Sequence, residues 1–399
     1  VITSADFPGA HDTLIDLGEG AINFRYASNN VMAGDKVLYK GHPVAAVAAL
    51  DKNTALEAAA LIKVDYEVLK PVSTVMEALK PGAPIVLEDL EGQDLGEKID
   101  GHTNQANHIR HEFGDVEKGF AEADIVIERE FDTAMVHQGY IEPHNATATW
   151  DEEGRVTIWT STQGSFPTRR QTAGILRLPD SSVKVIPLEI GGGFGGKIPS
   201  YLEPVAAILS RETGRPVKLL MERTSVFEST GPTPGTWMSA KVGVKNDGTI
   251  TAATADLRFD AGAYPGSPVG AGMMCVFSCY DIPNTRIDGY DVVVNKPKTA
   301  AYRAPGATQA AYAMETVVDE ICQKLGMDPL EFRIKNAAKE GTRRADGPIH
   351  PIIGAVETHE AAMASDHWNT PLEKNGPDGK LRGRGVASGY WFNIGLKSA

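Results

Sequence analysis

Alternating apolar and polar residues recur along the chain, and they predict strands more often than helices. Two turn sequences, Asp-Glu-Glu-Gly at 151–154 and Asn-Asp-Gly at 246–248, separate pairs of such segments and predict β-hairpins. Helical periodicity is clearest at 310–325, where Met314, Val317 and Ile321 share one face and Gly326 offers a C-cap. The predicted strands are 125–131, 147–150, 156–159, 183–190, 217–221, 237–244 and 249–259, and further helices are predicted at 202–209 and 330–338.

The first eighty residues predict a smaller unit. Strands are expected at 36–40 and 44–49, on either side of a Gly-His-Pro turn, with another at 63–66. Thr54 and Glu57 form the predicted capping box of a helix at 55–62. Residues 81–108, which are polar and glycine-rich, predict a linker, and residues 340–382 predict irregular structure. The expected organisation is a small α+β domain at 1–80, a linker at 81–108 and a larger α+β domain with mixed sheets at 109–399.

The composition narrows the function classes. With 399 residues, 42% of them hydrophobic and 23% charged, the chain is long enough for a substantial core. A net charge of −13 argues against a nucleic-acid partner, and the longest apolar run, 44–50, is too short for a membrane span. Three cysteines are too few for a disulfide framework and predict a reducing, cytoplasmic location. Cys275 and Cys279 predict buried thiols rather than metal ligands.

A run of five glycines around one phenylalanine, 191–196, is the most unusual feature of the chain, and Lys197 follows it directly. Such a run is typical of a backbone that needs positive φ or lies close to another group. A tight turn between a strand and a helix is the simplest interpretation. A dinucleotide site is an alternative, because Gly191, Gly193 and Gly196 match G-x-G-x-x-G and Glu222 follows. The hairpin predicted just after Glu222 argues against that fold, which needs a series of βαβ units.

Three other segments are dense in polar groups. His137, Glu142 and His144 predict either a hydrogen-bonded Glu-Pro corner or, with less support from their spacing, a zinc site. Gln163 ends the segment Trp-Thr-Ser-Thr-Gln, at the end of a predicted strand. Arg303 precedes a Pro-Gly turn and predicts an anion clamp or a surface salt bridge. The sequence holds no G-x-S-x-G, Walker or kinase motif, which argues against a serine hydrolase and a nucleotide-driven enzyme.

The order of these motifs resembles one family throughout the chain. E-P is followed by S-T-Q, G-G-G-F-G-G-K, A-Y-R-x-x-G-x-x-Q and G-M-D-P-L-E-F-R-x-K-N. This order is similar to that of the molybdopterin-binding subunit of the xanthine dehydrogenase, aldehyde oxidase and aerobic carbon monoxide dehydrogenase family. The resemblance implies a partial hammerhead α/β domain, followed by the first part of a molybdopterin-binding α+β domain.

The resemblance also implies a cofactor site without protein ligands to the metal, since molybdenum is held by the molybdopterin, often as its cytosine dinucleotide. Gln163 would donate a hydrogen bond to the apical oxo ligand, and Arg303 would contact the cofactor through its backbone. Glycines 192, 193 and 195 would let the backbone approach the metal closely. The implied cofactor contacts are Gln163, Gly192, Gly193, Phe194, Gly195 and Arg303, and the implied substrate pocket includes Phe194, Ile198 and Ala304.

Several positions depart from the family pattern. Ile198 stands where xanthine-specific members have a glutamate, and Ala271 stands where an arginine orients the purine, so both argue against xanthine. Ala304 stands where copper-containing members have a cysteine, which argues against carbon monoxide oxidation. The glutamate that serves as the general base lies outside this sequence. Neither end has the features of a natural terminus, so we expect a fragment or one half of a split polypeptide.

The implied function is hydroxylation of an aldehyde, an N-heterocycle or an aromatic acyl-type substrate, with water as the source of oxygen. The resemblance implies that electrons would leave through an iron–sulfur subunit with [2Fe–2S] clusters and an FAD subunit, in a dimer of heterotrimers. The clusters would lie on a partner chain because three cysteines are too few to hold them. One alternative is a cofactor-binding half with no catalysis of its own. A second and weaker alternative is an NAD-dependent dehydrogenase.

Overall fold

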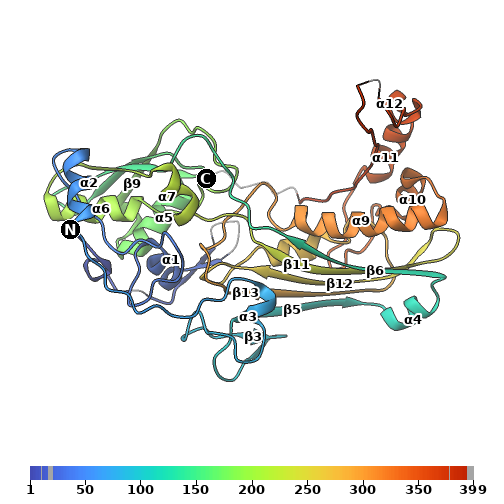
Figure 1. Ribbon diagram of the computed structural model, residues 1–399, viewed down its shortest axis with the longest axis horizontal. Helices are drawn as coiled ribbons and strands as arrows, with labels where there is room; N and C mark the ends of the chain where they lie inside the picture. Colours follow the sequence, from blue (N-terminus) through green and yellow to red (C-terminus); the bar gives the residue numbers. More distant parts are fainter. Residues whose placement is uncertain (10, 17–20, 377, 393–399) are drawn as a thin grey trace.

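Two mixed sheets organise the molecule, and they lie toward opposite ends of its long axis (Figure 1). The computed structural model describes residues 1–9, 11–16, 21–376 and 378–392. The larger sheet has five strands in the order β5-β13-β12-β11-β6, and only β12 and β13 run parallel. Its strands are β5 (Gln105–Phe113), β13 (Thr285–Val292), β12 (Ile250–Asp260), β11 (Thr236–Val244) and β6 (Ile125–Thr133).

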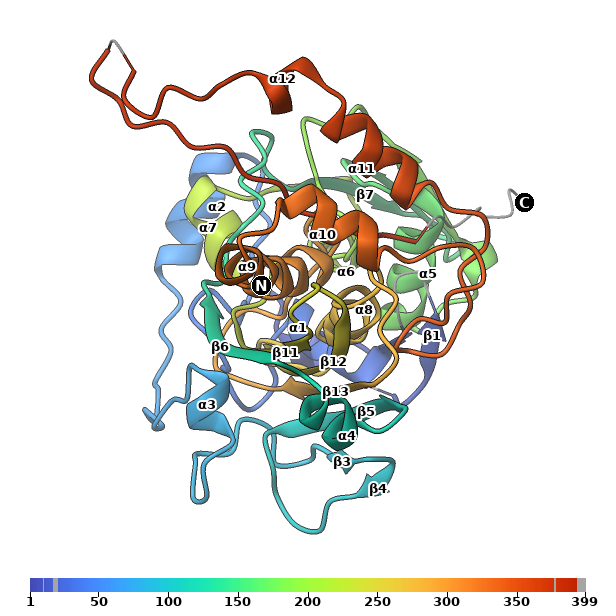
Figure 2. The same ribbon diagram turned by 90° about the vertical axis from the view of Figure 1, so that its right-hand side faces the viewer.

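The β11–β12 hairpin is the centre of this sheet. Its turn closes with a hydrogen bond from the Lys245 amide to the Thr249 carbonyl, and Gly248 takes φ +84° there. The hairpin predicted at 237–259 is therefore confirmed. One face of the sheet is covered by helices, which Figure 2 shows with α9 almost end-on over β6 and β11. These helices are α8 (Val269–Cys275), α9 (Ala307–Leu325) and α10 (Pro329–Asn336), while α4 (Val116–Ala121) joins β5 to β6.

Helix α9 buries the face that its periodicity predicts. Met314, Val317 and Ile321 are buried against the sheet, and Gly326 ends the helix in the left-handed conformation. Figure 1 shows α9 parallel to the long strands, so its apolar stripe runs along β11 and β6.

The smaller sheet has four strands in the order β10-β7-β8-β9, with only β8 and β9 parallel. Helices α5 and α6 pack on it, and their small residues with those of β7 form a tight core. All four strands lie within or close to the predicted bounds. The elements are β7 (Asn145–Trp150), β8 (Val156–Thr160), α5 (Ser165–Leu176), β9 (Val183–Pro187), α6 (Glu203–Thr213) and β10 (Val217–Leu220), with the short η2 (Asp180–Ser182) and α7 (Arg223–Ser229) alongside.

The first seventy residues contain fewer strands than predicted. Residues 36–40 and 44–49 form no sheet, and only Ala46 makes a bridge, to Ile2. The predicted capping box is also wrong, because Asp51 caps the helix by accepting from the Thr54 amide. The elements here are η1 (Ser4–Asp6), β1 (Leu14–Asp16), β2 (Ala21–Asn23), α1 (Phe24–Val31) and α2 (Lys52–Ala60).

The strand predicted at 63–66 is likewise absent. Its alternating apolar residues are exposed to solvent, Val64 by 41% and Tyr66 by 60%. The sequence pattern is that of a strand, but no neighbouring strand in the described part of the chain pairs with it.

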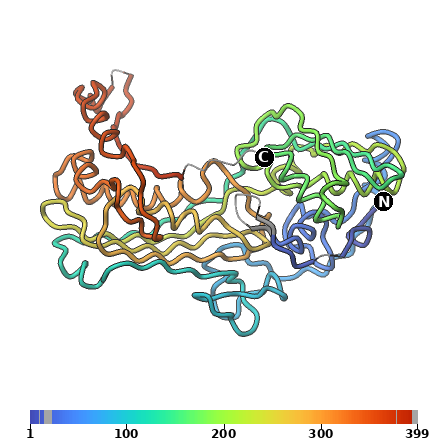
Figure 3. Tube along the Cα trace, turned by 180° about the vertical axis from the view of Figure 1, so that it is seen from behind, coloured from blue at the N-terminus to red at the C-terminus, as the bar shows by residue number. Residues whose placement is uncertain are grey.

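The segment predicted as a linker is part of a third core. Val86, Leu87 and Leu90 are buried together with Val75 of α3 (Val75–Ala78) and with Val292 at the end of β13. Seen from behind, this light-blue segment lies against the side of the large sheet away from α9 (Figure 3). It continues into the small hairpin of β3 (Gln93–Asp94) and β4 (Glu97–Lys98).

The C-terminal quarter is more regular than predicted, since α11 (Ala355–Met363) and α12 (Asp366–Asn369) interrupt the segment expected to be irregular. The proposed domain boundaries at 80 and 109 stay predictions. None of the helices in the described ranges combines the length and apolar character that crossing a bilayer demands.

Candidate functional site

The glycine run forms a tight loop directly after β9. Gly192, Phe194 and Gly195 all have positive φ, at +96°, +54° and +105°. A Cβ on Gly193 would lie 2.5 Å from Gln163 Oε1, and one on Gly195 would lie 2.4 Å from the Ala301 carbonyl oxygen. Both positions therefore require glycine, the first for close approach and the second for close approach and conformation.

One carboxylate oxygen holds both ends of this loop. Glu142 Oε2 accepts from the Gly191 amide at 2.8 Å, from Lys197 Nζ at 2.7 Å and from Ser161 Oγ at 2.5 Å. The Lys197 side chain is fully buried. Burial of Glu142 opposes its ionisation, but the hydrogen bonds from Lys197, Ser161 and Gly191 outweigh it and hold the pKa at about 2. Desolvation lowers the pKa of Lys197, opposed by the same pairing.

Gln163 shapes the interior of the loop. Its Oε1 accepts from the Gly195 amide at 2.8 Å and from the Lys197 amide at 3.2 Å. These two donors fix which end of the amide is oxygen. In the described part of the chain Nε2 donates to nothing, so it remains available as a donor beside the loop.

A second loop, carrying Arg303, is joined to the first. The Arg303 amide donates to the Phe194 carbonyl at 2.9 Å, and Arg303 and Ala304 both have positive φ, +37° and +63°. Two consecutive non-glycine residues in this region are strained, and such strain is concentrated at functional sites. Gln138 braces the same loop, because its Nε2 donates to the Ala301 carbonyl at 2.8 Å.

The histidines predicted as possible metal ligands bond to hydroxyl groups. His137 Nε2 lies 2.8 Å from Thr230 Oγ1, and His144 Nε2 lies 2.7 Å from the Tyr140 hydroxyl. Burial lowers the pKa of His137 to about 4 and that of His144 to about 3, so both rings are neutral at pH 7. Within the described ranges no three His, Cys, Asp or Glu side chains are grouped to hold a metal.

A cavity of about 390 Å³ begins just after the glycine loop, at Ile198. Its walls come from α1, from the 264–268 loop and from the segment that leads into the Arg303 loop. Of the predicted pocket residues, Ile198 lines this cavity, whereas Phe194 and Ala304 do not. Phe194 lies 51% exposed. The lining residues are Asn23, Tyr26, Ala27, Asn30, Gln171, Ile198, Pro199, Ser200, Tyr264, Pro265, Gly266, Ser267, Pro268, Lys298, Thr299, Ala300, Ala301 and Pro305.

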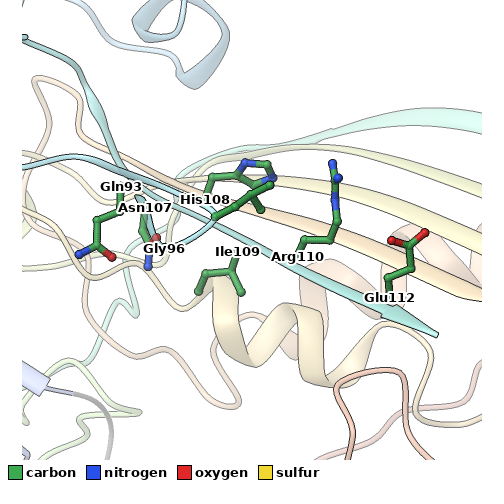
Figure 4. Close-up of a pocket in the computed structure, with 8 residues that line it drawn as sticks. Gln93, Gly96, Asn107, His108, Ile109, Arg110 and Glu112 are labelled. Atoms are coloured by element: carbon green, nitrogen blue, oxygen red, sulfur yellow. The ribbon is translucent and has the colours of Figure 1, made fainter. Parts of the chain in front are cut away.

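A second hollow, of about 570 Å³, lies on the edge strand β5 beside the β3–β4 hairpin. Figure 4 shows His108, Arg110 and Glu112 projecting from alternate positions of that strand. His108 is clamped between Asp94 at 2.5 Å and Asp288 at 2.8 Å. The hollow contains no predicted site residue.

The structure thus brings the predicted cofactor residues together at two joined loops. The hydrogen-bonded Glu-Pro corner predicted at Glu142 is confirmed, but the sequence analysis did not predict that Lys197 is its partner. A lysine directly after a glycine run is the available signal, because a buried amine there needs a carboxylate. The contribution of α1 to the cavity has no sequence signal.

These residues fit a cofactor that brings an oxygen acceptor toward the glycine loop. Gln163 Nε2 is a free donor held in one orientation, and the glycines leave no side chain in the way. The buried Gln138 Oε1 also lacks a partner among the described residues.

Comparison with known proteins identifies the family. Residues 100–337 match the molybdopterin cofactor-binding domain, and residues 1–70 match the a/b hammerhead domain of aldehyde oxidase and xanthine dehydrogenase. The nicotinate dehydrogenase large molybdopterin subunit of Eubacterium barkeri is 33% identical over 338 residues, which cover 83% of this chain and 76% of that protein. The carbon monoxide dehydrogenase large chain of Afipia carboxidovorans is 33% identical over 320 residues, covering 77% and 39%.

Similarity to a solved structure supports the same family. Reconstituted CO dehydrogenase from Oligotropha carboxidovorans superposes with a TM-score of 0.77 at 27% identity, over 92% of this chain and 47% of that chain. The chain therefore spans less than half of two of these three proteins. It belongs to the molybdopterin-binding large subunits of the xanthine dehydrogenase, aldehyde oxidoreductase and CO dehydrogenase family.

Proposed function

We propose that this chain binds the molybdenum cofactor in a molybdenum hydroxylase and forms one wall of its substrate site. When bound, the cofactor supplies oxidation of an electron-poor carbon, with oxygen from water. The orientation of the Gln163 amide carries this proposal, because its oxygen is fixed by two backbone donors and its nitrogen stays free beside the loop. A preoriented donor loses little on binding an oxygen ligand of the cofactor.

The residues of this chain would bind the cofactor and orient the substrate. Gly193 and Gly195 keep the loop surface clear, and Arg303 presents its backbone at the adjoining loop through its bond to the Phe194 carbonyl. Ile198 makes the wall of the cavity apolar next to the glycine loop, which favours a flat, weakly polar ring over xanthine. Ala304 offers no sulfur for copper. The substrate class is an aldehyde, an N-heterocycle or an aromatic acyl-type molecule, and the similarity to a nicotinate dehydrogenase favours the N-heterocycle.

The general base comes from elsewhere in the complete enzyme. Among the residues that line the 390 Å³ cavity there is no carboxylate, which supports this assignment. The same observation favours the alternative in which this chain binds cofactor while another chain carries the catalytic glutamate. We further propose the cytosine dinucleotide form of the cofactor, iron–sulfur and FAD partner subunits in a dimer of heterotrimers, and a cytoplasmic location, to which the three free cysteines are suited.

Elemental analysis and turnover of the full-length complex test the proposal. We expect stoichiometric molybdenum and oxidation of N-heterocycles. Gln163→Ala removes the donor and should lower kcat about a hundredfold, since one preoriented donor is worth that much. Gln105→Ala, which alters a half-buried glutamine on β5 that donates to the Gln93 carbonyl, is the control and should retain kcat. A purified complex without molybdenum contradicts the proposal. A complex that contains molybdenum but shows no turnover, even after the glutamate-bearing chain is supplied, would support cofactor binding and contradict the proposed hydroxylase activity.

A further inference from the structure

Lys298 is a half-buried ammonium group on the wall of the 390 Å³ cavity. Its Nζ donates to the Gly266 carbonyl at 2.8 Å, to the Thr299 carbonyl at 3.2 Å and to Thr299 Oγ1 at 3.4 Å. All three acceptors are neutral. No carboxylate in the described part of the chain lies within ion-pair distance of this nitrogen. A half-buried cation without an ion pair is uncommon, because its desolvation is not compensated.

Two other lysines of this region, the buried Lys197 and the half-buried Lys296, are paired. Lys197 contacts Glu142, and Lys296 contacts Asp260 at 3.0 Å. The charges of Asp291 and Asp260 oppose the lowering of the Lys298 pKa by burial, but neither carboxylate bonds to it, and both have other partners. Asp291 accepts from the Gly266 and Ser267 amides, and Asp260 accepts from Lys296. Lys298 therefore faces the cavity with charge that the protein itself does not neutralise.

The rest of the cavity suits a flat acid. Ile198, Pro199 and Pro268 give it apolar walls, while no lining residue carries a negative charge. The Oγ atoms of Ser200 and Ser267 find no hydrogen-bond partner among the described residues. Ser200 is 6% exposed. Both oxygens are buried, so recognition of a polar ligand group depends on Lys298 rather than on these hydroxyls.

We propose that Lys298 binds the carboxylate of an aromatic or heteroaromatic acid whose ring occupies this cavity toward Ile198. This inference rests on the proposed function only in naming that acid as the substrate of the complete enzyme. A charged hydrogen bond from Lys298 then distinguishes the acid from its neutral amide.

The pH dependence of the preference for the acid over the amide tests the proposal without any substitution. Burial lowers the pKa of Lys298 to about 8, and the charges of Asp291 and Asp260 oppose that shift. The other charged group nearby is Lys296, which is paired with Asp260, and the neutral Tyr26 and Tyr264 also line the cavity. Lys298 is charged at pH 7 and loses its proton above about 8, so preference for the acid should fall between pH 7 and pH 10.

Calorimetry on the full-length complex tests the proposal with pyridine-3-carboxylate and pyridine-3-carboxamide as probes. We expect the acid to bind at least about tenfold more tightly than the amide, the difference that one charged hydrogen bond provides. Lys298→Met should reduce this affinity ratio to near one, and Lys298→Arg should keep most of it. Lys36→Met is the matched control, because Lys36 is also half-buried and bonded to two carbonyls but pairs with Glu88. It should leave the ratio unchanged.

Equal affinity of the wild type for acid and amide would overturn the proposal, as would an unchanged ratio in Lys298→Met. Should Lys298→Met fail to fold, the ratio in the wild type across pH 7 to 10 decides, and a constant ratio overturns the proposal. Binding is measured without turnover. Loss of the acid preference in a complex that contains molybdenum and oxidises the amide therefore counts against Lys298 alone, and absence of molybdenum counts against the proposed function.

Discussion

At the scale of single residues, the site depends on positions where a side chain is excluded. Gly195 is the clearest case, because it combines φ +105° with a backbone oxygen 2.4 Å from where a Cβ would lie. The glycine thus serves both the loop's shape and its contact with the Arg303 loop. Arg303 and Ala304 carry the corresponding strain on the other side of that contact.

Gly195→Val should displace the glycine loop from the Arg303 loop and lower turnover of the complex by at least about a hundredfold, the loss expected when a preoriented donor moves. Gly154→Val is the matched control, since Gly154 also has positive φ but has open space around it. That variant should lose only about 1–2 kcal/mol of stability and retain turnover. Comparable turnover in the two variants would show that the loop is not at the reacting centre. Activity assays with thermal unfolding give both quantities.

Glu142→Gln should lower the free energy of unfolding by about 3 kcal/mol, because it leaves the buried Lys197 ammonium without its counter-charge. Glu128→Gln is the control. It removes an exposed pair with Lys241 and should cost less than about 1 kcal/mol. Urea denaturation at pH 7 measures both.

The pH dependence has a defined sign. The pKa of Glu142 is depressed from its ordinary 4.5 to about 2, so its stabilisation is complete above pH 4.5 and is lost as the pH falls toward 2. The difference in unfolding free energy between wild type and Glu142→Gln should shrink over that interval. A difference that stays constant from pH 7 to pH 3 would mean that the Glu142 charge does not hold the loop.

At the scale of elements, helix α9 is fixed to α10 by a buried ion pair. Arg333 of α10 donates to Glu315 of α9 at 2.7 and 2.9 Å, and neither side chain is more than 7% exposed. Tyr280, in the loop after α8, bonds to the other Glu315 oxygen. Glu315 therefore joins α9, the helix that begins after the Arg303 loop, to α10 and to the loop after α8.

Arg333→Met should destabilise the protein by about 3–5 kcal/mol by leaving the Glu315 carboxylate buried and unpaired. Arg129→Met is the matched control, because Arg129 pairs with Glu320 of the same helix at the surface, and it should cost less than about 1 kcal/mol. Equal losses in the two variants, measured by urea denaturation, would mean that burial of the first pair does not matter.

Elements with a local signal were predictable. The β11–β12 hairpin follows from Asn-Asp-Gly between two alternating runs, and α9 follows from its apolar stripe and Gly326. The strand predicted at 63–66 does not form, because alternation shows only that a segment could pair with a neighbouring strand. Whether it does depends on a partner strand that the segment's own sequence does not describe.

At the scale of the whole molecule, sequence neighbours are distributed among three cores. Ile2 and Phe24 join the core of the small sheet, whereas Leu38 and Val75 join the core behind the large sheet. The 390 Å³ cavity lies where these parts meet, which is why its walls come from α1 as well as from residues near 200, 266 and 300.

The sequence alone determined the strand pairs with strong turns, the main helix, the glycine loop and the family, because each depends on residues close together in the chain or on the order of motifs. The tertiary structure alone decided that Glu142 closes the loop through Lys197, that Gln163 presents its nitrogen, and that Lys298 reaches the cavity unpaired. Those facts depend on which distant donors and acceptors meet in space and on how far burial removes them from water. Neither quantity is set by local sequence.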